Sequence, residues 1–173
     1  MPNSRSGTFR VLGIDTSLRS TGVAVIEAVG NRLSAIEHGT LKNSRAAPHS
    51  ACLKRIDGGL SDLIARTEPN AVAIEGAFYS KNARTAMILG EARGVAIAAC
   101  ARVGLPVYEY APRRVKQALV GAGSASKIQV RKMVMTLLGL DEEPQEDAGD
   151  ALAIAICHLH SRSGHAAMAP EEI

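Results

Sequence analysis

Phe9-Arg-Val-Leu-Gly-Ile14, followed directly by Asp15, is the stretch on which the fold of this chain depends. A compact apolar run that stops at an acidic residue and the polar pair Thr16-Ser17 is typical of a buried strand that ends in a turn. A second run of this kind, Ala71-Val-Ala-Ile74, ends at Glu75. Ligands of open α/β sheets bind at the carboxyl ends of the strands. If the two strands are neighbours, Asp15 and Glu75 are therefore predicted to lie in one binding site at the carboxyl ends of the strands.

The hydrophobic pattern outward from these two strands predicts an α/β domain. Further strands are expected over residues 21–26, 33–41 and 105–110, and helices over 51–65, 83–101, 111–119, 126–138 and 147–160. Because three strands precede the first helix and strands and helices alternate afterwards, the order indicates a mixed five-stranded sheet flanked by helices. We expect a flexible leader over residues 1–8, a single domain over 9–162 and a flexible tail over 163–173.

The composition of the 173 residues excludes several classes of protein. With 46% apolar and 21% charged residues and a net charge of +3, the chain does not have the composition of a disordered protein. No apolar run reaches the roughly 18 residues that a membrane span needs, and the polar N-terminus lacks the apolar core of a signal peptide. Cys52, Cys100 and Cys157 are odd in number and far apart, so we expect reduced core thiols in a cytoplasmic protein. His158 and His160 are expected at the surface of the last predicted helix.

The small net charge hides a segregation of charged residues along the chain. Residues 79–132 contain ten Lys and Arg against two Glu, whereas residues 141–151 contain six acids and no base. Two solvated faces would explain this pattern. A surface that binds a polyanion, beside an acidic segment that collects metal ions, would explain it equally well.

Two further acids, Asp147 and Asp150, open the last predicted helix, and their spacing of three places both on one helical face. Taken singly, each acid has a structural explanation, because Asp15 suits a turn and Asp147 suits a helix start. Together with Glu75 they would form a crowded set of carboxylates that repel one another unless cations neutralise them. Oxygen ligands without His or Cys favour a hard cation such as Mg²⁺ or Mn²⁺. Two such ions about 4 Å apart can activate water and stabilise the leaving oxygen of a phosphodiester.

Phe78 and Tyr79 are unusual in a chain with 3% aromatic residues. They follow Glu75 within four residues and precede the polar run Ser80-Lys81-Asn82, which suits an exposed loop. One interpretation is that the rings lie in the core. The interpretation that we favour is that an exposed ring stacks on an unpaired base, which makes both residues candidate DNA contacts.

Several stretches of the sequence, in order and at matching spacing, resemble the RuvC family of Holliday-junction resolvases, which are bacterial crossover junction endonucleases. The resemblance extends from Val11 to His160. Its most specific stretches are Leu12-Gly-Ile-Asp15, Ala73-Ile-Glu75 followed by Phe78, Ala92-Arg-Gly-Val-Ala-Ile97, Val115-Lys-Gln117 with Gly123-Ser124 and Lys127, and Asp147-Ala-Gly-Asp-Ala-Leu-Ala-Ile-Ala155. The resemblance implies a ribonuclease-H-like fold and a Mg²⁺-dependent nuclease, with Mn²⁺ as a substitute and two ions in each active site. The implied catalytic residues and metal ligands are Asp15, Glu75, Asp147 and Asp150.

The resemblance also implies how the chain meets DNA and partner proteins. It implies DNA contacts from Lys116 and Lys127, base stacking by Phe78, and a basic residue near the cut strand at Lys81. Members of the family are homodimers that pack partly through the helix matching residues 83–101. They cut two opposed strands of a four-way junction symmetrically and leave 5′-phosphate ends, in recombination and repair. They work with a branch-migration complex of RuvA-type and RuvB-type proteins.

The sequence departs from the family pattern at two places. Thr16-Ser17 replaces the usual Pro-Gly after the first Asp, and Gly76 replaces the usual Gln after the strand-end Glu. The carboxylates remain, so these departures bear on turn geometry and substrate preference rather than on the reaction.

Three other functions fit the sequence less well. An actin-like ATPase needs a duplicated domain, for which 173 residues are too few. A nuclease that trims ribosomal RNA precursors is shorter and would leave the basic block unexplained. A protein that only binds junctions would need no set of carboxylates.

Overall fold

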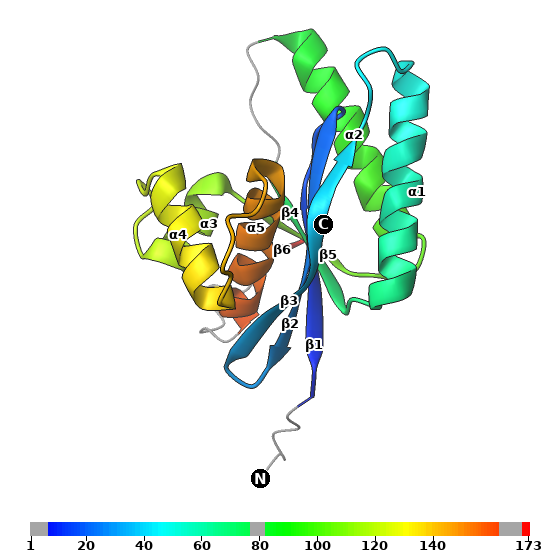
Figure 1. Cartoon of the computed structure of the whole chain (residues 1–173). Helices are drawn as coiled ribbons and strands as arrows, with labels where there is room; N and C mark the ends of the chain where they lie inside the picture. The colour runs from blue at the N-terminus through cyan, green and yellow to red at the C-terminus, as the bar shows by residue number, and fades with distance from the viewer. Residues whose placement is uncertain (1–6, 77–81, 163–170) are drawn as a thin grey trace.

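A six-stranded sheet with the order β3-β2-β1-β4-β5-β6 forms the centre of the computed structural model, which describes residues 7–76, 82–162 and 171–173 (Figure 1). The strands are β1 (Phe9–Asp15), β2 (Ser20–Val29), β3 (Arg32–Lys42), β4 (Ala71–Glu75), β5 (Val107–Tyr110) and β6 (Glu171–Glu172). The pairings β1–β2 and β2–β3 are antiparallel, whereas β4 is parallel to both β1 and β5. The prediction of a mixed sheet with five strands is confirmed, and β6 extends it at one edge.

In the ranges that the structure describes, five helices cover the two faces of the sheet. They are α1 (His49–Thr67), α2 (Ala83–Ala101), α3 (Pro112–Val120), α4 (Lys127–Leu138) and α5 (Glu146–Arg162). The first two lie on one face, and α3, α4 and α5 lie on the other (Figure 1). Each corresponds to a helix predicted from the apolar periodicity. None of the helices in the described ranges is long and apolar enough to cross a membrane.

The strand β6 at the sheet edge was not part of the sequence prediction, which gave only a flexible tail over residues 163–173. Glu172 pairs with Tyr108, and the backbone N–H of Ile173 donates to the carbonyl of Val107 at 3.0 Å. Two residues are too few to show a strand period in the sequence.

Helix α5 packs very closely on the sheet, at two glycines that face it. A Cβ on Gly13 would lie 2.1 Å from the carbonyl oxygen of Ala151, and one on Gly22 would lie 1.9 Å from that of Asp147. Real Cβ atoms do not approach oxygen so closely, so both positions need glycine for this packing. The helix is buried along most of its length, including every residue from 151 to 159. The first turn of α5 is thereby pressed against the end of β1 and the beginning of β2.

His158 lies in the interior, so the prediction of a surface position was wrong for this residue. It is 1% exposed, and its Nδ1 shares a hydrogen bond of 2.8 Å with the hydroxyl of Tyr110. Burial lowers the pKa of His158 to about 4. His160 is exposed, as predicted. The pattern misled because α5 is buried on nearly all sides and Tyr110 satisfies the buried imidazole.

Candidate active site

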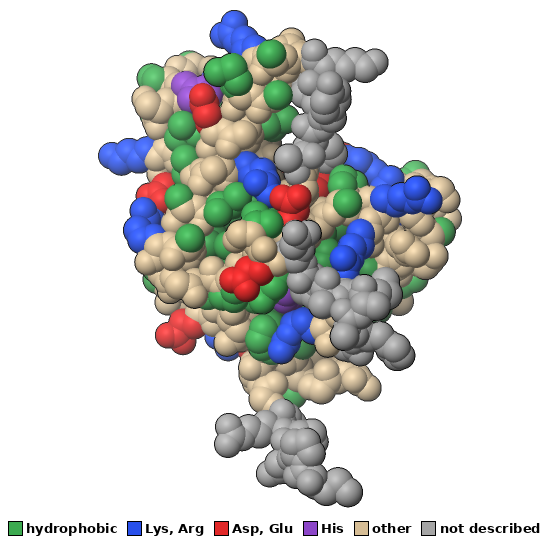
Figure 2. All heavy atoms as spheres, turned by 180° about the vertical axis from the view of Figure 1, so that it is seen from behind, with side chains coloured by type: hydrophobic (Ala, Val, Ile, Leu, Met, Phe, Trp, Pro, Cys, Tyr) green, Lys and Arg blue, Asp and Glu red, His purple; other side chains and the backbone are tan. Residues whose placement is uncertain are grey.

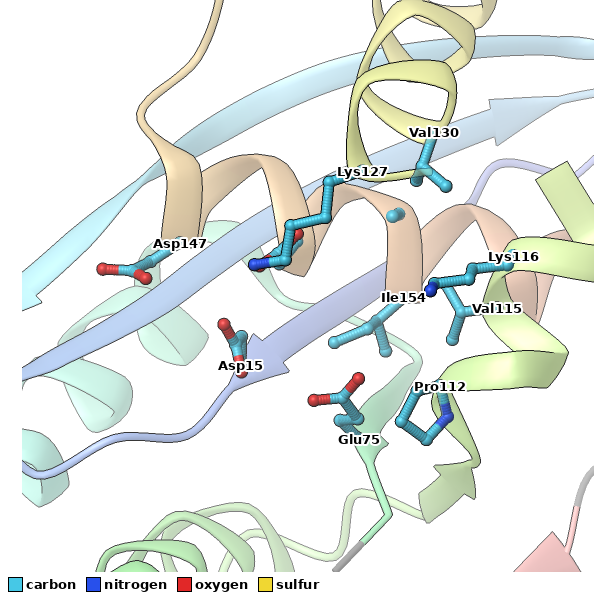
Figure 3. Close-up of a pocket in the computed structure, with 11 residues that line it drawn as sticks. Asp15, Glu75, Pro112, Val115, Lys116, Lys127, Val130, Asp147 and Ile154 are labelled. Atoms are coloured by element: carbon cyan, nitrogen blue, oxygen red, sulfur yellow. The ribbon is translucent and has the colours of Figure 1, made fainter. Parts of the chain in front are cut away.

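Asp15 and Glu75 lie side by side at the carboxyl ends of two neighbouring parallel strands. The register pairs Ile14 of β1 with Ile74 of β4, and each strand continues by one residue to its acid. Neighbouring strands are about 4.8 Å apart. Both carboxylates point into the same pocket, as predicted for acids at the ends of neighbouring strands (Figure 3).

That pocket has a volume of about 390 Å³ and brings together residues from both ends of the chain. Helix α5 contributes Asp147 and Asp150 from its first turns, in the position that Gly22 allows. All four predicted carboxylates therefore line one cavity. The complete lining is Asp15, Glu75, Pro112, Val115, Lys116, Lys127, Val130, Asp147, Asp150, Ala153 and Ile154.

The electrostatics of the pocket show an excess of negative charge. The pKa of Asp15 is raised to about 7, chiefly by burial and next by the negative charges of Asp150 and Asp147. Burial also raises the pKa of Glu75 to about 7, with Asp15 as the next cause. Burial raises the pKa of Asp150 as well. A carboxyl pKa near 7 means that the ionised form is poorly compensated, so a cation bound here would relieve a cost that the free protein carries.

Lys127 of α4 compensates part of the negative charge of the pocket, because its own charge lowers the pKa of Asp15 and Glu75. Its Nζ lies 3.0 Å from Oε1 of Glu146 and 3.7 Å from Oδ2 of Asp150, and the hydrogen bond to Glu146 is the main reason why the pKa of Lys127 is raised. Glu146 is a functional candidate that the sequence reasoning missed, although it belongs to the acidic segment and directly precedes Asp147. Lys116 lines the same pocket, and its charge lowers the pKa of Glu75.

The chemistry of the donor set fits hard divalent cations, because the pocket offers carboxylate oxygens without a thiolate or imidazole. In the described residues, no group of three or more His, Cys, Asp or Glu side chains is yet arranged to hold one ion together. Lys127 occupies one side of Asp150, and a hydroxyl occupies one side of Asp147. The residues therefore fit the ion in type and place, and binding would require the side chains to close around it.

The hydroxyl beside Asp147 belongs to Ser20, which donates a short hydrogen bond to Oδ2. No signal in the sequence singles out this serine at the start of β2. The turn between Asp15 and Ser20 carries the unusual Thr16-Ser17 pair. It is closed by Thr21, whose hydroxyl donates to the carbonyl of Ser17 at 2.5 Å.

The basic side chains lie next to the carboxylates. In the view from behind, Lys and Arg side chains gather over the lobe that α3 and α4 form, beside acidic side chains near the middle of that face (Figure 2). Arg131 of this lobe is paired with Glu143. Two residues of the basic block, Lys116 and Lys127, therefore line the acidic pocket itself. Arg84 and Arg93, by contrast, belong to α2 on the other face of the sheet (Figure 1).

Three predicted DNA contacts, Phe78, Tyr79 and Lys81, lie outside the described residues. They remain predictions. The residue before this gap, Gly76, is described: its backbone N–H donates to the carbonyl of Tyr110 at 2.8 Å, and a Cβ on it would lie 3.2 Å from Oε1 of Glu109. A larger residue at position 76 would crowd Glu109, which is paired with Arg93 of α2.

Comparisons with known proteins show the family of this chain. Residues 11–158 match the family model described as crossover junction endodeoxyribonuclease RuvC. Relatives of that name from Citrifermentans bemidjiense and Pelobacter propionicus are each 50% identical to this chain. The alignments cover 87% of the chain and 92% of the first relative, and 88% of the chain and 87% of the second.

Solved structures give the same result. Thermus thermophilus RuvC in complex with a Holliday junction substrate superposes with a TM-score of 0.88 at 33% identity, covering 95% of this chain and 99% of that one. The yeast mitochondrial Holliday junction resolvase superposes with a TM-score of 0.66 at 13% identity, covering 88% and 78% of the two chains. This second likeness concerns the fold alone.

Proposed function

This chain belongs to the RuvC family of crossover junction endodeoxyribonucleases, and we propose that the four carboxylates of its pocket form the catalytic centre. Its fold is the ribonuclease-H-like fold of that family, and its function is the resolution of Holliday junctions, in recombination and repair. The proposal assigns the site: Asp15, Glu75, Asp147 and Asp150 bind the metal on which hydrolysis depends.

The observation that carries the assignment is that carboxylates from β1, β4 and α5 line one pocket, in which burial raises the pKa of Asp15 and Glu75 to about 7. Their excess charge favours a divalent cation, and oxygen ligands favour Mg²⁺, with Mn²⁺ as a substitute. We propose two ions in each site, because four carboxylates surround the pocket. Ions held by these carboxylates would supply activation of the attacking water and charge stabilisation of the leaving oxygen.

The chain's own residues orient the DNA. Lys127 neutralises Asp150 and Glu146 in the free protein, and cations bound at the carboxylates would release its ammonium group for a phosphate. Lys116 lines the opposite part of the pocket and supplies a second positive charge. These two lysines hold the phosphate backbone beside the carboxylates without reading its sequence.

Phe78, Tyr79 and Lys81 complete the proposed DNA interface. They follow Glu75 in the sequence, so the segment that contains them begins at the pocket. An aromatic ring there would stack on a base that is unpaired at the junction centre, and Lys81 would contact the cut strand. Two symmetric cuts that leave 5′-phosphate ends then resolve the junction.

The wider assembly is also part of the proposal. A junction has two equivalent phosphates to cut, which suits a homodimer with two-fold symmetry. We propose that residues 9–162 form the nuclease domain, that α2 forms part of the dimer interface, and that a branch-migration complex of RuvA and RuvB type delivers the junction. The proposed compartment is the cytoplasm.

The test compares the parent protein with Glu75→Gln and Asp147→Asn on a labelled four-way junction, beside a linear duplex. Each substitution removes one negative ligand and should reduce Mg²⁺-dependent cutting on the order of 10³-fold, because metal stabilisation contributes several kcal/mol. Junction binding should stay intact or become tighter, since less negative charge opposes the phosphates. Glu37→Gln, at a surface ion pair with Arg66, is the matched control. Cutting by both site variants within tenfold of the parent would contradict the assignment.

A further inference from the structure

We infer that Ser20 is a positioning residue for the metal site, because its hydroxyl restricts the rotation of the Asp147 carboxylate and leaves one carboxylate oxygen for a cation. The inference deepens the proposed function and rests on it.

The central observation is the hydrogen bond from Ser20 Oγ to Oδ2 of Asp147, across 127 positions of the sequence. Among the described residues, Ser20 is the side chain that donates a hydrogen bond to the carboxylate of Asp147. A carboxylate has two oxygens, so Ser20 occupies one and leaves the other available. Asp150 is different, since its nearby positive charge comes from the long, exposed side chain of Lys127.

The backbone around Ser20 is held by β3 and the residue that follows it. Ser20 is the first residue of β2 and pairs with Lys42 of β3. Just before it, the carbonyl of Arg19 accepts from the backbone N–H of Asn43 at 2.9 Å. The carbonyl of Leu18 accepts from Nδ2 of the same asparagine at 2.8 Å. The hydroxyl of Ser20 is therefore presented from a fixed point, although the turn lacks the Pro-Gly pair of the family.

The backbone of Asp147 is held as well. Its carbonyl lies against Gly22, at a distance that admits no Cβ. Gly22 is only two residues beyond Ser20 on the same strand, so β2 contacts Asp147 twice: through the backbone at Gly22 and through the side chain at Ser20. With both backbones fixed, the remaining freedom is the rotation of the Asp147 side chain, and the hydrogen bond restricts that rotation.

A hydrogen bond to a metal-ligating carboxylate increases the affinity of the site for the metal. Groups that hydrogen-bond to ligating carboxylates orient them, and their loss typically costs about 10–100-fold in metal affinity or activity. A purely structural link between β2 and α5 would act on stability instead. The closely packed contact at Gly22 already joins these elements, so we expect the hydroxyl to affect ion binding far more than folding.

The experiment compares Ser20→Ala, Ser20→Cys and Ser20→Thr with the parent, each as the full chain. Ala removes the donor, Cys keeps the size with a weak donor, and Thr keeps the hydroxyl. Thr40→Ala is the matched control, because it removes a hydroxyl that donates at 2.9 Å to Gln145, two residues before Asp147. The readouts are Mn²⁺ binding to the DNA-free protein by electron paramagnetic resonance, the Mg²⁺ concentration for half-maximal junction cutting, and the melting temperature.

We expect Mn²⁺ affinity to fall about tenfold in the Ala and Cys variants, with a matching rise in the Mg²⁺ requirement and nearly parental cutting at saturating Mg²⁺. The Mn²⁺ affinity and the Mg²⁺ requirement of Ser20→Thr and Thr40→Ala should stay within twofold of the parental values. The melting temperatures of all variants should remain close to that of the parent. Unchanged Mn²⁺ affinity in both the Ala and Cys variants would overturn the inference, as would an equal loss in the Thr40 control. If the parent itself neither binds Mn²⁺ nor cuts the junction with Mg²⁺, the proposed function fails, which is a different result.

Discussion

At the scale of single residues, the site is defined by carboxylates whose charge the free protein compensates only in part. Asp15 and Glu75 have a pKa of about 7 chiefly because burial disfavours the ionised form. In the unfolded chain their pKa values would be near 4. Ionisation of these groups therefore lowers the free energy of unfolding of the metal-free protein.

Asp15→Asn tests this consequence. Between about pH 4 and pH 7 the folded protein retains a proton on Asp15 that the unfolded chain has lost, so the stability of the metal-free parent decreases as the pH rises through this window. The variant lacks this titration. Its melting temperature should exceed that of the parent at pH 8 and approach it at pH 5, measured by circular dichroism in the presence of a chelator.

Asp62→Asn, on the exposed face of α1, is the control and should show no such pH-dependent gain. Mg²⁺ should raise the melting temperature of the parent at pH 8 and have little effect on the Asp15 variant. A constant difference between variant and parent from pH 5 to pH 8 would contradict the charge argument.

Lys116→Ala tests the basic side of the pocket. If Lys116 binds one phosphate, its loss should flatten the slope of log affinity for the junction against log salt by about one unit. The measurement is a salt series of binding titrations without divalent ions. Lys54→Ala, on the exposed face of α1 across the sheet, should leave the slope unchanged. Equal slopes for Lys116→Ala and the parent would remove this lysine from the interface.

The residues that the sequence could and could not predict differ in a physical way. Asp15 and Glu75 interrupt apolar runs, so their place at strand ends follows from local pattern alone. Ser20 and Glu146 have no local signal, because their importance comes from partners brought close by folding. His158 was misplaced for the same reason: its partner, Tyr110, is 48 positions away.

At the scale of elements, the position of α5 depends on the two glycines of β1 and β2. The residues that face α5 form a row across four neighbouring strands. In this row Asp15 of β1 is paired with Gly22 of β2, and Glu75 of β4 is paired with Tyr110 of β5. Sequence periodicity predicted each of these elements. It could not predict how closely α5 approaches the sheet, because that distance depends on both partners.

Gly22→Ala should displace the first turn of α5, since the new Cβ would lie 1.9 Å from the carbonyl oxygen of Asp147. Overpacking costs about 1–3 kcal/mol, which corresponds to a fall in melting temperature of about 2–12 °C at this size. Junction cutting at 25 °C, where the variant is still folded, should fall at least tenfold because Asp147 moves with the turn.

Gly39→Ala on β3 is the control, because a Cβ there meets nothing within 4 Å. It should retain both stability and cutting. Parental cutting by Gly22→Ala at 25 °C would show that the site tolerates a displaced helix.

At the scale of the whole molecule, α2 has a face that the other described residues leave uncovered. Met87, Gly90, Gly94 and Ala98 are exposed along this face, and a Cβ on either glycine would meet nothing within 4 Å. The helix is apolar on most of its circumference, which favours burial on a second side. These features support α2 as part of the interface of the proposed homodimer.

Gly94→Leu should therefore yield a folded monomer. The added side chain projects into open space in a single chain but would obstruct close approach of a second helix. Sedimentation at micromolar concentration should show a dimer for the parent and a monomer for the variant, with weaker junction binding. Gly58→Leu, at an exposed glycine of the neighbouring helix α1, is the control and should remain a dimer. A monomeric parent, or a dimeric Gly94→Leu, would exclude this interface.

The contact between β2 and the start of α5 also has a consequence for protein synthesis. Ser20 and Asp147 are separated by 127 positions, so ribosomes working at ~5–20 residues per second would need roughly 6–25 s to make the second after the first. Once Glu75 has been made, the nascent chain has Asp15 and Glu75 but lacks the helix that completes their pocket until α5 follows. With the proposed catalytic centre, such a nuclease would be unable to cut the nucleic acid that surrounds it on the ribosome until the last helix has docked.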